Sequence, residues 1–239
     1  MIADHEDLDI PAWTWPLTWG AAVAVVIAFL AALGYAPREQ VMGEVQRIFY
    51  FHVSAGWVGA LGFMVAAVCG GLYLRRPSAS LDDLGHASVE IGLVFTVINI
   101  ITGSIWARPV WNTWWTWDPR LITASVMAVV YVGYLVLRFS IELPESRGRM
   151  SAGYAILGFV TVPMTFFSIR LFRTIHPVVV GASTAGAESI GMSGRMAATL
   201  CLSMAAFTLL FAALLTHRLR LSRLQRIVEN RTWRQLESQ

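Results

Sequence analysis

The sequence predicts an all-α integral membrane protein, a bundle of six transmembrane helices with a tryptophan-rich outer loop between the third and fourth. Apolar residues make up 56% of the 239 residues and charged residues only 14%, which is too apolar a composition for a water-soluble domain. Six apolar segments each approach the length of about 20 residues that a helix needs to cross the hydrocarbon core. No long polar stretch separates them, so we expect one polytopic membrane domain over residues 1–239.

The six segments follow one another along the chain with short connections. Glycine and proline occur inside several of them, which membrane helices tolerate because neighbouring helices satisfy the freed backbone groups. The expected spans are residues 17–36, 53–74, 87–105, 121–141, 151–171 and 196–216.

The distribution of arginine predicts the orientation of these spans. All 18 basic residues are arginine, and more of them lie in the loops after the second and fourth spans and in the C-terminal basic tail of residues 217–239 than on the opposite side. Because cytoplasmic loops carry an excess of Lys and Arg, we expect this side and both termini to be cytoplasmic. A basic tail suits an anionic lipid bilayer, and no motif for nucleic acid is present, so we expect no nucleic-acid partner.

Half of the ten tryptophans lie in the tryptophan-rich segment, residues 106–120, between the third and fourth spans. Two prolines and an asparagine there argue against a continuous helix, so we expect a structured loop. Its indole rings would form a rigid surface suited to a planar, mostly apolar ligand that carries carboxylates. The alternative is an aromatic belt at the membrane surface, but this density favours a dedicated site. The five rings belong to Trp106, Trp111, Trp114, Trp115 and Trp117.

Two histidines are expected on the same outer side as the tryptophan-rich segment. His52 opens the second span and His176 follows the fifth, whereas His86 and His217 fall at the cytoplasmic ends. A single histidine at a helix end is usually a solvated or capping residue. A pair beside a tryptophan surface can instead supply both axial ligands of a haem iron.

Outer-side arginines are candidate partners for the propionates of such a haem. Bidentate Arg–carboxylate contacts are strong and directional, and we select Arg47, Arg108 and Arg120. Asp118 has two interpretations: it holds Arg120 or meets a partner, or it is the N-cap of the fourth span with Pro119 at the first helical position.

Three motifs resemble those of a known family. The first runs from Trp106 to Leu121 and contains Trp-Trp-Thr-Trp-Asp-Pro-Arg-Leu, the second is Gln-Arg-Ile-Phe-Tyr-Phe-His-Val ending at Val53, and the third is Arg-Thr-Ile-His ending at His176. With these motifs the chain resembles the WWD-type haem-handling membrane proteins of cytochrome c biogenesis, and within them the haem exporter protein C (CcmC) family. The likeness extends over most of the chain.

The resemblance implies a haem-handover protein rather than an enzyme. Haem b would be held by His52, His176 and the tryptophans at the periplasmic face of the bacterial cytoplasmic (inner) membrane, and presented for attachment to the haem chaperone CcmE. The implied partners are also the ABC-transporter subunits CcmA and CcmB and the small membrane protein CcmD.

Two other classes remain as alternatives. A b-type electron-transfer subunit would also hold haem, but such proteins usually bury it between transmembrane helices with the histidines well inside the spans. A solute channel or transporter would need paired intramembrane charges, and Glu90 is the only acid well placed inside an expected span.

Overall fold

A computed structural model describes residues 11–40, 42–177 and 192–237, and within these ranges six helical segments are long and apolar enough to cross a membrane. This confirms the predicted fold class. The helices are α1 (Thr14–Leu30), continued by the π-helix η2 (Ala31–Tyr35), the 3-10 helix η3 (Glu44–Gln46), α2 (Arg47–Arg75), α3 (Ala79–Trp111), α4 (Pro119–Ser140), α5 (Pro144–Phe159), α6 (Thr161–Leu171) and α7 (Gly194–Glu237).

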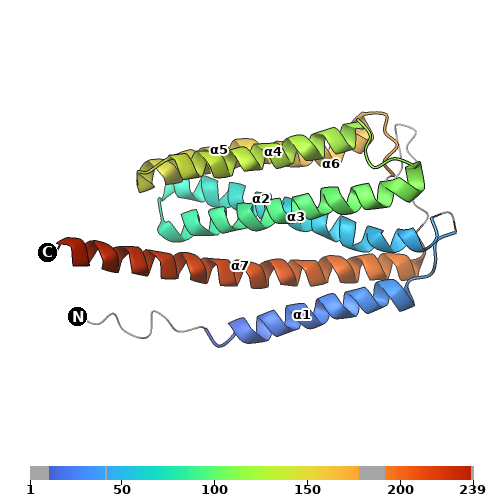
Figure 1. The fold of residues 1–239 in the computed structure, drawn as a ribbon, viewed down its shortest axis with the longest axis horizontal. Helices are drawn as coiled ribbons and strands as arrows, with labels where there is room; N and C mark the ends of the chain where they lie inside the picture. Colours follow the sequence, from blue (N-terminus) through green and yellow to red (C-terminus); the bar gives the residue numbers. More distant parts are fainter. Residues whose placement is uncertain (1–10, 41, 178–191, 238–239) are drawn as a thin grey trace.

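The helices run back and forth along one axis (Figure 1). α1 and α7 lie side by side at one edge, α4, α5 and α6 form the other, and α2 and α3 pack between them. The start of α1 and the end of α7 share one end of the bundle, while the connection from α3 to α4 lies at the other end. With six spans that alternate in direction, the chain begins and ends at the same end of the bundle, and the connection after the third span lies at the other end. The tryptophan-rich segment is therefore far from the described chain ends.

Several helices extend beyond the expected spans, among them α7, which continues to Glu237 through the expected C-terminal tail. Two of the differences affect the site. α2 begins at Arg47, so His52 lies in its second turn and not at the helix start; the polar residues there lower the hydropathy without stopping the helix. α3 continues through Trp111 although Pro109 lies in its last turn. A proline at this position removes one hydrogen-bond donor, and only two helical residues follow it. Asn112, with φ of 55°, ends the helix in the left-handed conformation. Within the tryptophan-rich segment, residues 106–120, only residues 112–118 are non-helical, and we call them the tryptophan loop.

The fifth span consists of two helices with a break at Val160. α6 carries Pro163 in its first turn, and a proline at this position cannot donate to the carbonyl oxygen of Phe159. The interrupted backbone pattern explains why α5 ends at Phe159 and α6 begins at Thr161.

The core lies where α2 meets its neighbours. A Cβ atom added at Gly62 of α2 would lie 2.6 Å from the carbonyl oxygen of Ser88 in α3, so glycine is required for the close approach of these two helices. On another face of α2, the ring of Phe63 stacks on that of Tyr131 in α4 with centroids 3.4 Å apart.

Ion pairs join the helices toward the end of the bundle that holds the chain ends. Arg138 of α4 donates two hydrogen bonds of 2.7 Å to Asp82 of α3, and Arg218 of α7 lies 2.6 Å from Glu90 of α3. Glu90 is therefore a structural contact between helices, and the two pairs fix α3 against both α4 and α7.

Candidate functional site

His52 is held against α3 by a set of polar contacts. Its Nδ1 atom lies 3.0 Å from the backbone oxygen of Asn99 and 3.2 Å from the Thr102 hydroxyl. The Thr102 hydroxyl donates to the oxygen of Ile98, which leaves its own oxygen as an acceptor. The Asn99 side-chain nitrogen also lies 3.2 Å from Nδ1. In the tautomer with the proton on Nδ1, donated to the Asn99 carbonyl, Nε2 keeps its lone pair.

The neighbouring α3 residues fix the position of the same ring. The Asn99 side-chain amide donates a 2.8 Å hydrogen bond to the backbone oxygen of His52. A Cβ atom at Gly103 would lie 2.9 Å from Cε1 of the His52 ring, which is too close for carbon atoms. The ring therefore occupies its position because residue 103 has no side chain.

His176 lies beyond α6 in the histidine segment, residues 172–177. Its backbone N–H donates to the Thr174 hydroxyl at 3.0 Å, and its Nδ1 lies 3.1 Å from the oxygen of Pro177. Burial, helped by the nearby charge of Arg120 and by His52, lowers the pKa of His176 to about 3. The imidazole is therefore neutral near pH 7, and as in His52 a carbonyl oxygen engages Nδ1 and leaves Nε2 as the candidate metal-binding atom.

Asp118 connects the histidine segment to the first turn of α4. It is the N-cap of α4, with Pro119 at the first helical position, and its carboxylate accepts the backbone N–H of Arg120 at 2.9 Å. The same carboxylate accepts the Thr174 hydroxyl at 2.6 Å and the backbone N–H of Ile175 at 3.0 Å. Asp118 is buried, so one side chain both caps a helix and positions the segment that bears His176.

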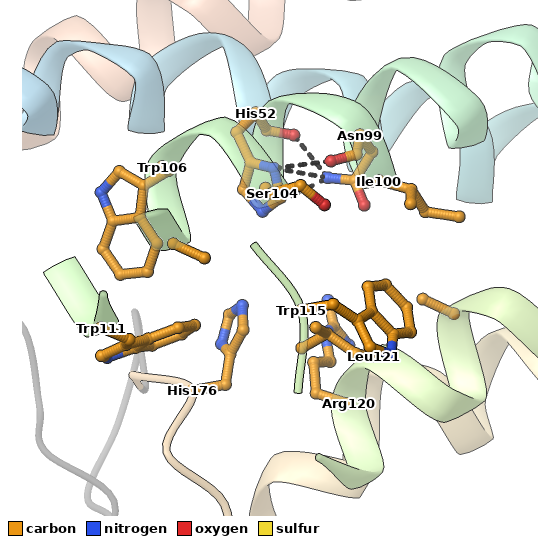
Figure 2. A pocket seen from close by; sticks show the side chains of 13 residues that line it. His52, Asn99, Ile100, Ser104, Trp106, Trp111, Trp115, Arg120, Leu121 and His176 are labelled. Atoms are coloured by element: carbon orange, nitrogen blue, oxygen red, sulfur yellow. Dashed lines mark hydrogen bonds between the residues drawn. The ribbon is translucent and has the colours of Figure 1, made fainter. Parts of the chain in front are cut away.

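The two histidines line one cavity at the end of the bundle where α3 meets α4 (Figure 2). Their rings approach it from opposite sides, His52 from α2 and His176 from the histidine segment. About 490 Å³ of space, part of it open to solvent, lies between the lining residues. We call this site the two-histidine cavity. Its other side chains include Trp106, Trp111, Trp115 and Arg120.

The five tryptophans divide into two groups. Trp106 and Trp111, on the last two turns of α3, contact each other edge-on with centroids 4.9 Å apart, and the Trp111 ring lies 6.4 Å from that of His176. With Trp115 they line the two-histidine cavity. Trp114 and Trp117 do not line it and are 58% and 80% exposed.

The three candidate arginines also separate. Arg120 lines the cavity, donates to the backbone oxygen of Thr165, and lies 5.0 Å from the centroid of the Phe166 ring. Arg108 lies outside the lining and donates to both oxygens of Asn112.

Arg47 is likewise outside the lining of the two-histidine cavity. It donates to Glu44 and to the backbone oxygens of Ala32 and Leu33, so it binds carbonyl groups within η2, where α1 ends.

Sequence reasoning missed Asn99, Thr102 and Gly103, which position the His52 ring, and named Thr174 only as a member of the third motif. An asparagine inside an apolar span is a detectable signal, because an unpaired amide is costly in hydrocarbon. Gly103 and Thr174 carry no such signal, since their importance depends on contacts with distant residues.

The fold and the site define a class: a six-span membrane protein with a tryptophan-lined cavity that two histidines face from opposite sides. The family model described as Heme exporter protein C, CcmC, matches residues 7–235. The chain belongs to this family.

Curated relatives agree with this membership. Heme exporter protein C of Escherichia coli K12 is 33% identical over 211 residues, which cover 86% of this chain and 83% of that protein. Heme exporter protein C of Bradyrhizobium diazoefficiens is 31% identical over 202 residues, 83% of this chain and 75% of the relative. A putative cytochrome c biosynthesis ccmC-like mitochondrial protein of Marchantia polymorpha is 29% identical over 150 residues, covering 63% of each chain.

Proposed function

We propose that this protein holds haem b in the two-histidine cavity and hands it on for cytochrome c biogenesis. The observation that carries the proposal is the matched state of the two histidines: each has a carbonyl oxygen beside Nδ1, and both rings line one cavity. Nε2 of His52 and Nε2 of His176 would then be the axial ligands of the iron. We propose haem b because the sequence lacks the Cys-x-x-Cys-His motif of covalent attachment.

The remaining lining residues fit the organic part of haem. Trp106, Trp111 and Trp115 offer apolar ring surface to a flat macrocycle. Arg120 is the one of the three candidate arginines that lines the cavity, and its guanidinium can bind a propionate. We propose Arg120 as the main propionate partner, with Arg47 and Arg108 as members of the surrounding structure.

The handover step is assigned to the exposed tryptophans. Trp114 and Trp117 are well exposed beside the cavity, and aromatic side chains are enriched at protein interfaces. We propose that they meet the haem chaperone CcmE, while Asp118 acts on handover only through the histidine segment. CcmA, CcmB and CcmD are the further proposed partners.

We propose that the two-histidine cavity faces the periplasm and that both termini are in the cytoplasm of a bacterial inner-membrane protein. Support comes from the arginine-rich end of the chain: six of the seven arginines of α7 lie in its second half, at the end of the bundle opposite the cavity. Reporter fusions after Asn112 and near residue 230 test this orientation. A cytoplasmic signal from the fusion after Asn112 would contradict it.

An absorption spectrum of the protein purified from haem-sufficient cells tests haem binding. We expect the bands of a six-coordinate low-spin haem, lost in His52→Ala and in His176→Ala. His217→Ala serves as the matched control because His217 is far from the cavity, in contact with Thr18 of α1. Equal loss in the control would refute the assignment of the axial ligands.

A further inference from the structure

A second cavity lies at the end of the bundle opposite the two-histidine cavity. It is bounded by the beginning of α1, the beginning of α3 and the second half of α7, and contains about 1090 Å³ of empty space. We call it the basic cavity. The lining residues used below are Trp13, Thr14, Asp83, Arg220, Arg223 and Arg226.

The charge of the basic cavity is positive. Arg226 is paired with Asp83, the only acidic residue among the described residues that line the cavity. Arg220 and Arg223 form no ion pair within the described parts of the chain. Their spacing of three residues places them on one face of α7, so two guanidinium groups remain for an anion.

Two buried polar atoms in this lining have no hydrogen-bond partner among the described residues: the hydroxyl of Thr14, whose residue is 1% exposed, and Nε of Arg220. Buried polar groups in folded proteins are nearly always hydrogen bonded. Both groups can donate a hydrogen bond, and no described residue accepts one from either of them.

The basic cavity lies at the depth of the lipid headgroups. Thr14 begins the first membrane-crossing segment and Ala79 begins the third, so the cavity sits where two apolar segments end. Trp13, which precedes α1, and Trp15 and Trp19 in its first two turns are 57%, 50% and 67% exposed, and exposed tryptophans are typical of the membrane–water interface.

We propose that the basic cavity binds the headgroup phosphate of an anionic phospholipid. Arg220, Arg223 and the Thr14 hydroxyl bind the phosphate oxygens, and the acyl chains lie along the exposed apolar face of α1. Basic pockets between transmembrane helices bind lipid headgroups in this way. The site is independent of haem, because its residues come from the other end of the bundle.

Native mass spectrometry of the detergent-purified full chain tests the site. Dioleoyl-phosphatidylglycerol is titrated against dioleoyl-phosphatidylcholine, which has the same acyl chains and no net charge. We expect one phosphatidylglycerol per chain to bind in preference to phosphatidylcholine. Arg220→Gln combined with Arg223→Gln should weaken this binding by about tenfold or more, and Thr14→Val, which removes only a hydroxyl, by about threefold.

The matched control is Arg75→Gln combined with Arg76→Gln. This pair removes the same charge from the same end of the bundle, at two exposed positions outside the basic cavity. Its phosphatidylglycerol affinity should equal that of the wild type, and circular dichroism melting should show that all variants are folded. Thr14→Val keeps the test valid if the arginine variant does not fold.

Three outcomes would overturn the proposal. Equal loss in the control pair would mean that general surface charge attracts the lipid. Equal binding of phosphatidylcholine would mean that the cavity does not distinguish an anionic phospholipid from one without net charge. Inorganic phosphate that competes as strongly as the lipid would identify a free-anion site and not a lipid site.

Discussion

The Thr174 hydroxyl donates a 2.6 Å hydrogen bond to the Asp118 carboxylate, and this contact joins the tryptophan loop to the histidine segment. The two residues are 56 positions apart in the chain. Because the same carboxylate caps α4, the N-terminus of α4 serves as the fixed point from which His176 reaches the cavity. Residues around a metal ligand commonly set its orientation in this way.

Asp118→Asn should therefore weaken haem binding without disrupting α4. Asparagine is a good N-cap, but it loses the charge that strengthens the bond from Thr174. We expect a haem dissociation constant raised roughly 10- to 100-fold, measured by haem titration with absorbance detection. Thr174→Val should give a similar change, and the double variant should be no worse than either single one. Additive effects would show that the two residues act separately.

Gly103→Ala should displace the His52 ring. The added methyl group would lie 2.9 Å from its Cε1 atom, so either the ring or the helix must shift. We expect haem affinity to fall about tenfold or more. Gly153→Ala is the matched control, since nothing lies within 4 Å of a Cβ atom at that position. An unchanged haem titration in Gly103→Ala would mean that the ring is not held where the packing places it.

Arg120→Gln should reduce haem affinity at least about tenfold, because hydrogen bonds to charged groups contribute about 1.5–3 kcal/mol. Arg108→Gln should have little effect, since Arg108 lies outside the cavity lining. Titration with haem dimethyl ester, which lacks free carboxylates, separates propionate binding from structural damage. The wild type and Arg120→Gln should bind the ester equally, and a persisting difference would rule out Arg120 as the propionate partner.

Trp117→Ala should retain haem and lower its covalent attachment to CcmE. Its side chain is 80% exposed and outside the cavity, so its removal takes little contact from the macrocycle. Trp111→Ala should instead reduce haem retention, because its ring lines the cavity near His176. Haem stain of CcmE, normalised to the haem content of each variant, checks both expectations. If Trp117→Ala transfers haem to CcmE normally, Trp117 has no part in the handover and only lies at the membrane interface.

The six spans could be predicted because hydropathy over about 20 residues is a local property of the chain. The end of α3 could not: Pro109 was interpreted as part of a loop, yet within the last turn of a helix it removes a single hydrogen-bond donor. The N-cap at Asp118, followed by Pro119, was recognisable as a local motif and is confirmed.

The contacts that build the site are not local, which limits what the sequence can predict of it. Nothing near Thr174 indicates that it binds Asp118, because the contact exists only once α4 and the histidine segment are packed together. The expected role of Arg47 shows the same limit. Its place on the outer side suggested a partner for a haem propionate. In the fold, its guanidinium instead donates to the carbonyl oxygens of Ala32 and Leu33 at the end of a helix.

The most direct test of the central claim is the low-temperature electron paramagnetic resonance spectrum of the oxidised, haem-loaded protein. If His52 and His176 both bind the iron, the wild type gives a low-spin signal of bis-histidine type, and each single alanine variant converts it to high-spin or loses haem. Imidazole added to His176→Ala should restore the low-spin signal. A low-spin bis-histidine signal that survives in both single variants would contradict the account.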